Sequence, residues 1–264
     1  MKHRLKQNMG ASLVLAVIAS SAAAASAQIT IYSDNFSGSG GALNGSAVDV
    51  GGQNWQAGSA FLDNGTVNTV VAASANGQAA WLPFAPVNGT VYTATATILN
   101  TNPDWIAFGF MPALPVGGDW TATDFGVRHS NSGAHAWGFS RNNATQNDQE
   151  FFNGVNTSNN TGLGGNLADP ANPITLGIVL DTTGATWTAQ YFLNGVQQGG
   201  SFNLPATANT GIGGIGFSRD RNATAGTGGV ISAFSLTQVP EPTTFAMLAL
   251  GASLLGMRLR RNLK

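Results

Sequence analysis

Two acidic residues, Asp148 and Glu150, have a spacing that could support acid–base chemistry. Residues two apart on a β-strand point to the same face, so both carboxyl groups could serve one site. Hydrolysis of a glycosidic bond usually needs two carboxylates about 5 to 10 Å apart, one acting as acid and the other as nucleophile or base. Glu150 is the only glutamate among residues 28–238. We therefore expect the pair to lie in a solvated turn and the protein not to be an enzyme.

Residues that could bind a metal ion are sparse. His129 and His135 are six positions apart, and neither helical nor strand spacing places them side by side. Asp119 with Asp124, or Asp148 with Glu150, offers hard oxygen ligands, but neither pair has the dense spacing of a calcium-binding loop. We expect ordinary polar roles for these residues and no bound metal.

The motifs of common enzyme classes are also missing. Gly211, Gly213 and Gly216 match the dinucleotide pattern G-x-G-x-x-G, but they lie in an expected strand with no helix after it. The sequence contains neither G-x-S-x-G nor H-E-x-x-H. We expect no cofactor.

Tryptophan is the residue type best suited to contact a sugar without doing chemistry, because its ring can stack on a pyranose face. In a domain poor in leucine and isoleucine, most tryptophans should instead fill the core. Trp105 and Trp120 are the first candidates for a sugar contact, because they border proline- and glycine-rich loops, where binding residues gather. The other four tryptophans could also stack on sugar rings if they were exposed on one concave sheet: Trp55, Trp81, Trp137 and Trp187.

Residues 28–238 are strongly acidic once the two ends of the chain are set aside. They contain four arginines, no lysine and eleven acidic residues, which gives a net charge of −7. Nucleic-acid binding needs clustered Lys and Arg, so this class of function is excluded. The chain has no cysteine, so the domain must be held by a hydrophobic core.

Frequent turns between short alternating segments predict an all-β domain. Asn-Gly pairs, which tolerate the positive φ of tight hairpin turns, occur at Asn44, Asn64, Asn76, Asn88, Asn153 and Asn194. Residues 90–99 alternate with the period of two that is typical of a strand covered on one face. Strands are expected over 29–32, 67–72, 78–82, 90–99, 106–111, 135–140, 174–180, 186–193, 212–217 and 230–237. This pattern favours an antiparallel two-sheet jelly-roll sandwich.

Two stretches resemble a known family of sandwiches. Residues 174–195 resemble the hairpin of laminin-G-like, concanavalin-like jelly rolls, whose second strand ends in an Asn-Gly turn. The opening residues 34–38, with Trp55, are similar to the first strands of such exported domains. Glycosidases of this fold carry E-x-D-x-x-E or a close variant on one strand. Asp148 and Glu150 lack the third acid of that motif.

The start of the chain has the three parts of a secretory signal peptide. Lys2, Arg4 and Lys6 form a positive region, and residues 11–19 form a short apolar region. Ala25 and Ala27 then form a small-residue cleavage site of the A-x-A kind. We expect a signal peptide at residues 1–27; an N-terminal membrane helix is the alternative, and the short apolar region argues against it.

The end of the chain has a second targeting pattern. Pro240, Glu241 and Pro242 form a boundary that neither a helix nor a strand can cross. The 13 uncharged residues 245–257 follow, fewer than the ~20 that a membrane-spanning helix needs. The basic cluster after them suits the cytoplasmic side of a membrane, and it consists of Arg258, Arg260, Arg261 and Lys264.

This order closely resembles the PEP-CTERM sorting signal of exported proteins in Gram-negative, exopolysaccharide-producing bacteria. The resemblance implies recognition of Pro240, Glu241 and Pro242 by a membrane-embedded exosortase. Residues 245–257 would be a transient membrane helix, with Arg258, Arg260 and Arg261 as its stop. An ordinary single-span tail anchor is the alternative. The expected organisation is a signal peptide at 1–27, a sandwich at 28–238 and a sorting signal at 239–264.

Two functions of different class remain. The preferred one is a non-enzymatic protein of the cell surface or extracellular matrix, structural or weakly binding to polysaccharide in a biofilm context. The alternative is a secreted carbohydrate-active enzyme, a glycosidase or lyase. The expected partners are an exosortase-like processing enzyme and extracellular polysaccharide, with membrane contact only through the C-terminal helix before processing.

Overall fold

The computed structural model describes the sandwich and little of the two chain ends. One compact unit spans Ile29–Gln238, and the terminal segments are grouped apart from it. The predicted signal peptide, apart from Ala27, and the predicted sorting helix lie outside the described residues. Within the described part, no helix is long and apolar enough to cross a membrane. The described residues are 27–38, 40–58, 61–63, 67–69, 78–100, 105–112, 127, 135–143, 146–152, 158–160, 172–219 and 230–240.

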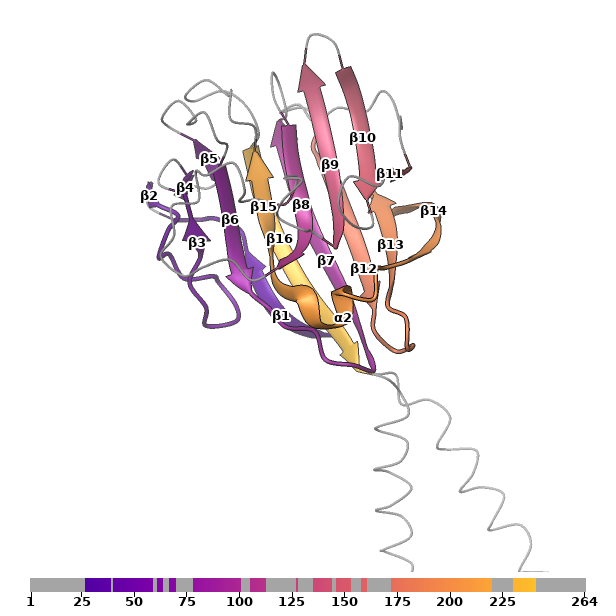
Figure 1. Cartoon of the computed structure of the whole chain (residues 1–264). Coiled ribbons are helices and arrows are strands. Elements are labelled where there is room, and N and C mark those ends of the chain that lie inside the picture. The colour runs from indigo at the N-terminus through magenta and orange to yellow at the C-terminus, as the bar shows by residue number, and fades with distance from the viewer. Residues whose placement is uncertain are drawn as a thin grey trace, which may run out of the picture. The chain divides into compact units, whose positions relative to one another are not determined.

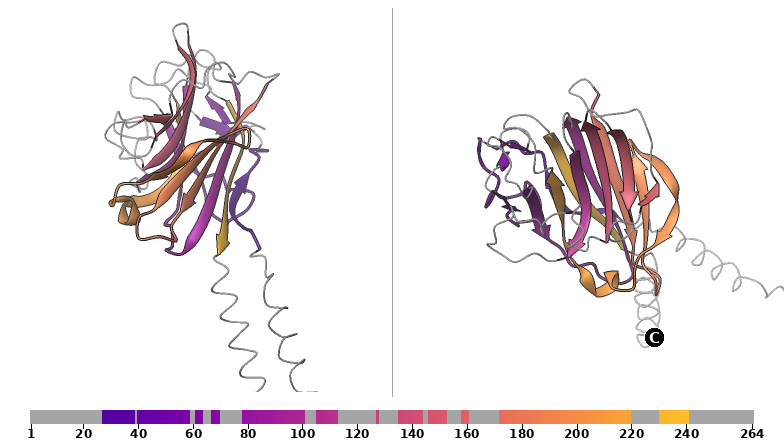
Figure 2. Two further views of the ribbon diagram at one scale, coloured as in Figure 1. Left: turned by 90° about the vertical axis from the view of Figure 1, so that its right-hand side faces the viewer. Right: turned by 45° about the horizontal axis from the view of Figure 1, so that its top comes forward.

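The described strands form two antiparallel sheets that pack face to face (Figure 1, Figure 2). The nine-stranded sheet has the order β14-β13-β12-β7-β16-β5-β4-β2, and β1 also pairs with β16. Its strands are β1 (Ile29–Asp34), β2 (Gly41–Ala42), β4 (Phe61–Asp63), β5 (Val67–Thr69), β7 (Thr90–Asn100), β12 (Ile174–Asp181), β13 (Thr188–Leu193), β14 (Val196–Asn203) and β16 (Val230–Pro240). This architecture confirms the predicted all-β sandwich.

The second sheet has seven strands in the order β11-β10-β9-β8-β15-β6-β3. They are β3 (Gln56–Ala57), β6 (Gln78–Pro83), β8 (Trp105–Pro112), β9 (Ala136–Asn143), β10 (Gln146–Phe152), β11 (Ser158–Asn160) and β15 (Ile212–Arg219). A short helix, α2 (Ala208–Gly211), precedes β15 at one end of the sandwich (Figure 1).

Alternation in the sequence places the inward face of most strands. In β7 the buried residues are Thr90, Tyr92, Ala94, Ala96 and Ile98, while the threonines at the positions between Tyr92 and Ile98 are half-buried. β8 differs, because Ile106 and each residue through Met111 are buried. β8 is therefore covered on both faces, and the seven-stranded sheet has a second apolar layer on its outer side.

The Asn-Gly signals give turns of two kinds. Asn194 and Gly195 have φ values of 50° and 77° and join β13 to β14 as a hairpin, as predicted. Asn88 and Gly89 also form a turn, but it joins β6 in one sheet to β7 in the other. An Asn-Gly pair specifies the local reversal, whereas the burial of each flanking strand decides which sheet that strand joins.

The expected solvated turn at Asp148 and Glu150 is wrong, because both residues lie in β10, which pairs with β9 over seven positions. The stretch Gln146-Asn-Asp-Gln-Glu150 has no alternating apolar residues, so its sequence carries no strand signal. Pairing with β9 determines its conformation. Short or polar strands were missed for the same reason: β2, β3, β4, β11 and β14.

An aromatic cluster ties the two sheets together. Trp55, with 1% of its surface exposed, lies 5.3 Å from Phe217 of β15 and 5.2 Å from Phe234 of β16, measured between ring centroids. Phe36 packs 5.8 Å from the same indole. Aromatic rings at such separations add roughly 0.5–1.5 kcal/mol per pair beyond area burial.

The first prediction concerns Thr182, which joins the end of β12 to the turn before β7. Its hydroxyl lies 2.7 Å from the carbonyl oxygen of Val87 and 2.8 Å from that of Thr90, and it accepts the Thr90 amide at 3.1 Å. Thr182→Val keeps the shape but leaves the buried Thr90 amide without its acceptor and removes the hydroxyl donor beside the Val87 carbonyl. We expect it to lower the free energy of unfolding by about 1–3 kcal/mol, measured by urea denaturation.

The neighbouring Thr183 provides a matched control. It is exposed and its side chain makes no hydrogen bond among the residues that the structure describes. Thr183→Val should change the stability by less than about 0.5 kcal/mol. Equal effects of the two substitutions would contradict the role assigned to the Thr182 hydroxyl.

Candidate functional site

The outer side of the seven-stranded sheet carries a second group of packed apolar residues, three of them aromatic, which we call the outer aromatic cluster. In β6, Ala80 and Leu82 belong to the core between the sheets, whereas Ala79 and Trp81 belong to this second cluster. Trp105 packs against its margin. The cluster consists of Ala79, Trp81, Ala107, Met111, Val127, Trp137 and Phe139.

Most tryptophans are buried, as the composition predicted. Trp81 and Trp137 in this cluster each expose 2% of their surface, and Trp55 and Trp187 are buried between the sheets. Trp105 is different, because it is only half-buried. Its ring centroid lies 6.2 Å from that of Phe139, which in turn lies 6.4 Å from that of Trp137. Trp120, the other candidate for a sugar contact, lies outside the described residues.

The glycine-rich strand β15 is explained by this packing. A Cβ atom at Gly214 would lie 2.6 Å from Cε3 of Trp81, and one at Gly216 would meet the carbonyl oxygen of Ala80. Gly211, at the end of α2, would meet Nε2 of His135 at 2.6 Å. Close approach of neighbouring side chains and backbone therefore accounts for these glycines without a nucleotide.

The register of the sheet brings the two candidate acids beside the margin of the outer aromatic cluster. Trp105 of β8 pairs with Arg141 of β9, which pairs with Asp148 of β10. Glu150 pairs with Phe139. The Cα atoms of Asp148 and Glu150 are about 6.6–7 Å apart, because a strand rises ~3.3–3.4 Å per residue. The backbone thus places two acidic positions near Trp105, without the third acid of the glycosidase motif.

His135 has an internal role in the fold. It is 7% exposed, and its ring hydrogen-bonds to the backbone of Gly211. Burial lowers the pKa of His135, because a charged imidazolium would lose its hydration. His129 and the pair Asp119 and Asp124 lie outside the described residues. Within the described part, no group of three His, Cys, Asp or Glu side chains could hold a metal ion.

Three aspartates that the sequence analysis did not single out fix the loop after β1. Asp34 accepts the Phe36 amide at 2.7 Å and the Trp55 indole N–H at 2.6 Å. Asp49 accepts the Asn35 amide at 2.9 Å, and Asp63 accepts the Gly38 amide at 3.0 Å. These carboxylates satisfy backbone donors, so their role is structural. The only signal in the sequence is the Asn or Gly that follows each of them within two positions, which is typical of turns.

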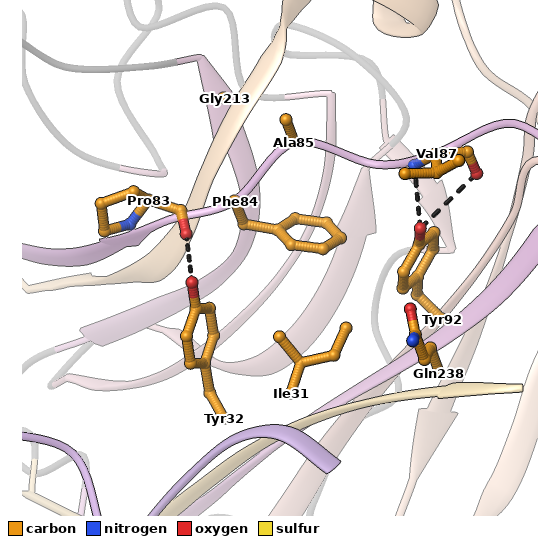
Figure 3. Close-up of a pocket in the computed structure, with 9 residues that line it drawn as sticks. All are labelled: Ile31, Tyr32, Pro83, Phe84, Ala85, Val87, Tyr92, Gly213 and Gln238. Carbon is orange, nitrogen blue, oxygen red and sulfur yellow. Dashed lines mark hydrogen bonds between the residues drawn. The ribbon is translucent and has the colours of Figure 1, made fainter. Parts of the chain in front are cut away.

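A hollow of about 480 Å³ opens at one end of the sandwich (Figure 3). Figure 3 shows Phe84 between two tyrosines, both of which point to the segment 83–87. Tyr32 donates to the Pro83 carbonyl at 2.6 Å, and the Tyr92 hydroxyl accepts the Val87 amide at 2.8 Å. The tyrosine hydroxyls are used within the fold, so this hollow offers a ligand mainly apolar contact.

Of the residues named for the predicted targeting signals, only Ala27 and Pro240 are described. Ala27 is exposed and directly precedes Gln28 and β1, whereas Ala25 is not described. Pro240 is the last residue of β16. The other residues of the predicted sorting signal lie outside the described residues: Glu241, Pro242, Arg258, Arg260 and Arg261.

Residues 238–262 match the family model described as the PEP-CTERM protein-sorting motif. The chain carries a PEP-CTERM sorting motif. This match confirms the resemblance seen in Pro240, Glu241 and Pro242 and the basic residues near the end. A PEP-CTERM signal indicates an exported protein with a transient membrane stage. No curated protein matches the chain.

Solved structures similar to the chain include lectin-like sandwiches. The carbohydrate recognition domain of Emp47p has a TM-score of 0.50 and 17% identity, over 83% of this chain and 99% of that one. Peanut lectin has a TM-score of 0.49 and 12% identity, over 81% and 98%. An endo-1,3-beta-glucanase from Streptomyces sioyaensis has a TM-score of 0.46 and 14% identity, over 83% and 99%. The likeness to the Emp47p domain shows the fold alone, a concanavalin-like β-sandwich, as predicted.

The second prediction concerns the pH dependence that Asp34 gives to stability. Burial raises the pKa of Asp34, and the nearby Asp49 and Asp63 add to this, despite the opposing hydrogen bonds from Trp55 and Phe36. Folding therefore favours the protonated form. The stabilisation that Asp34 contributes is complete below its unfolded pKa of about 3.9 and is lost as the pH rises through its higher folded pKa.

The measurement compares wild type with Asp34→Asn in urea unfolding at a series of pH values. Subtracting the two curves cancels the other titrating groups. We expect the free energy of unfolding of wild type, minus that of Asp34→Asn, to fall as the pH rises from about 3. The difference should become constant above the folded pKa. If this difference rises with pH instead, the hydrogen bonds to the Asp34 carboxylate affect its pKa more than its burial does.

Proposed function

We propose that the protein is a non-enzymatic protein of the cell surface or extracellular matrix whose sandwich binds polysaccharide weakly through Trp105. The observation that carries this proposal is the half-buried indole of Trp105 at the margin of the outer aromatic cluster. Packing against Phe139 holds the ring in place, so a ligand need not restrict it further.

The chemistry of the domain supports contact with a sugar more than turnover of one. Stacking needs only an aromatic face and tolerates variation in the polymer. Hydrolysis needs an acid and a base in one site, and residues 28–238 contain a single glutamate. The fold shared with the carbohydrate recognition domain of Emp47p agrees with sugar contact, but it does not identify a ligand.

A glycosidase or lyase is the alternative, and one specific observation favours it. The register places Asp148 and Glu150 at alternate positions of β10, one strand away from Arg141 and Phe139. A Cα separation of about 6.6–7 Å for two alternate strand residues is compatible with the carboxylate spacing of glycoside hydrolysis. This arrangement makes Glu150 the residue whose substitution separates the two functions.

The proposed location follows from the two targeting signals. Export through the signal peptide and retention by residues 245–257 would hold the precursor at the inner membrane of a Gram-negative bacterium. An exosortase-like enzyme would then process it near Pro240, Glu241 and Pro242. The sandwich would remain at the surface or in an exopolysaccharide matrix, with no lasting membrane contact.

The third prediction tests the proposed function. Trp105→Ala should weaken binding to the producer's own exopolysaccharide by about 5- to 30-fold, since loss of one stacking ring costs roughly 1–2 kcal/mol. Trp105→Phe should retain part of the affinity because it keeps an aromatic face. Affinity electrophoresis in gels that contain the polysaccharide measures the change. Unaltered migration of Trp105→Ala would contradict the role of this residue, and Trp120→Ala tests the second candidate.

Glu150→Gln is the control in the same experiment. It should leave the affinity nearly unchanged, because stacking does not use this carboxylate. The wild-type protein should also release no reducing sugar or unsaturated product from the polysaccharide. Product released by wild type and not by Glu150→Gln would establish the enzyme instead.

The fourth prediction concerns processing. The surface form should begin near Gln28 and end near Pro240, Glu241 and Pro242, without residues 245–264. The physical reason is that two short apolar segments suit transient insertion better than permanent anchoring. Intact-mass spectrometry of the surface form measures this. Recovery of a species that still contains residues 245–264 would mean that the tail is an anchor.

A further inference from the structure

A polar hollow of about 470 Å³ lies beside β3, an edge strand of the seven-stranded sheet. Four carboxamide side chains line it, from Asn44, Gln53, Asn54 and Gln56. None of the described residues that line it carries a charge. The hollow therefore offers neutral hydrogen-bond donors and acceptors, in contrast to the apolar hollow of Figure 3.

The carboxamides have hydrogen-bonding capacity to spare. The Asn44 side-chain oxygen accepts the Ala57 amide at 3.1 Å, which fixes the orientation of the group and leaves its nitrogen to donate. Gln53 and Asn54 are exposed, and their side chains make no hydrogen bond with any described residue.

Two glycines keep the hollow open. Gly45 and Gly52 have φ values of 86° and 66°, in the left-handed region that favours glycine. A Cβ atom at either position would meet no atom within 4 Å, so the space above them is empty. The backbone turns that shape the hollow thus also leave it free for a ligand.

We infer that this hollow binds one unit of an uncharged polysaccharide, through hydrogen bonds from its carboxamides to sugar hydroxyl groups. A carboxamide presents a donor and an acceptor side by side, which matches adjacent hydroxyls on a sugar ring. An anionic sugar would need Arg or Lys to pair with its charge. Neither occurs among the described lining residues, and the domain around the hollow carries a net charge of −7.

The hollow and Trp105 are positioned to contact the same polymer. Gln56 pairs with Trp81, and directly paired residues of antiparallel strands share a face, so Gln56 lies on the outer side of the sheet. Three strand spacings separate β3 from β8, about 14 Å, and the register offset to Trp105 adds about 13 Å along the strands. Two weak contacts at this separation would bind one chain more tightly than either does alone.

This inference rests on the proposed function, and the experiment separates the two. The full-length chain, kept in a detergent without sugar groups, is titrated calorimetrically with maltohexaose, laminarihexaose and a hexamer of alginate. We expect binding of a neutral hexamer and at least tenfold weaker binding of the alginate hexamer at moderate salt. The double variant Gln53→Ala/Asn54→Ala should weaken neutral binding at least fivefold. Circular dichroism checks that each variant is folded.

Two further variants sharpen the test. Asn44→Asp keeps an acceptor for the Ala57 amide but removes the free donor, so it should also weaken binding. Gln197→Ala removes an exposed carboxamide from β14, outside the hollow, and should leave the affinity unchanged. Equal loss in Gln197→Ala and in the double variant would overturn the inference.

The remaining outcomes are also decisive. If Trp105→Ala abolishes binding and the hollow variants bind as wild type does, the proposed function stands and this inference fails. If alginate binds as tightly as the neutral hexamers, the inferred ligand class is wrong. If neither the hexamers nor the producer's own polysaccharide binds, the proposed function fails and the inference fails with it.

Discussion

The contact on which the sandwich most depends is that between the buried indole of Trp55 and the carboxylate of Asp34. The indole packs on Phe217 from one sheet and Phe234 from the other, so it joins the two layers. Asp34 also accepts the amide of Phe36, whose φ of 55° is costly for a residue other than glycine. Burial of the Phe36 ring, with 0% exposed, offsets that cost. In a chain without cysteine, such contacts take the place of disulfide crosslinks.

The second apolar layer limits where the domain can meet a ligand. The seven-stranded sheet uses Trp81, Trp137 and Phe139 to pack its outer side, so these rings are not available for stacking. Trp105 remains half-buried at the margin, and uncharged carboxamides remain at the β3 end. The proposed weak contact with a neutral polymer would use this half-buried ring and these carboxamides.

The sequence predicted strands well where one face is apolar and poorly where burial comes from elsewhere. The strands β12 and β13 followed from the alternation of residues 174–180 and 186–193, and the turn at Asn194 marked the end of β13. β10 could not be predicted in this way, because its residues 146–150 are all polar and its pairing with β9 fixes it. The Asn-Gly pair at Asn88 indicated a turn, but not which sheets the strands on its two sides join. That depends on pairing with strands far away in the sequence.

The sequence alone determined the targeting signals and the all-β class, because both depend on local order: charge beside short apolar segments, and alternation between turns. It also limited the candidates for a catalytic acid and base, because residues 28–238 contain a single glutamate. Tertiary structure decided which tryptophans are buried, why β15 is rich in glycine, and which carboxamides surround a hollow. These properties depend on strands brought together from distant parts of the chain, and on side chains that compete for the same space across them.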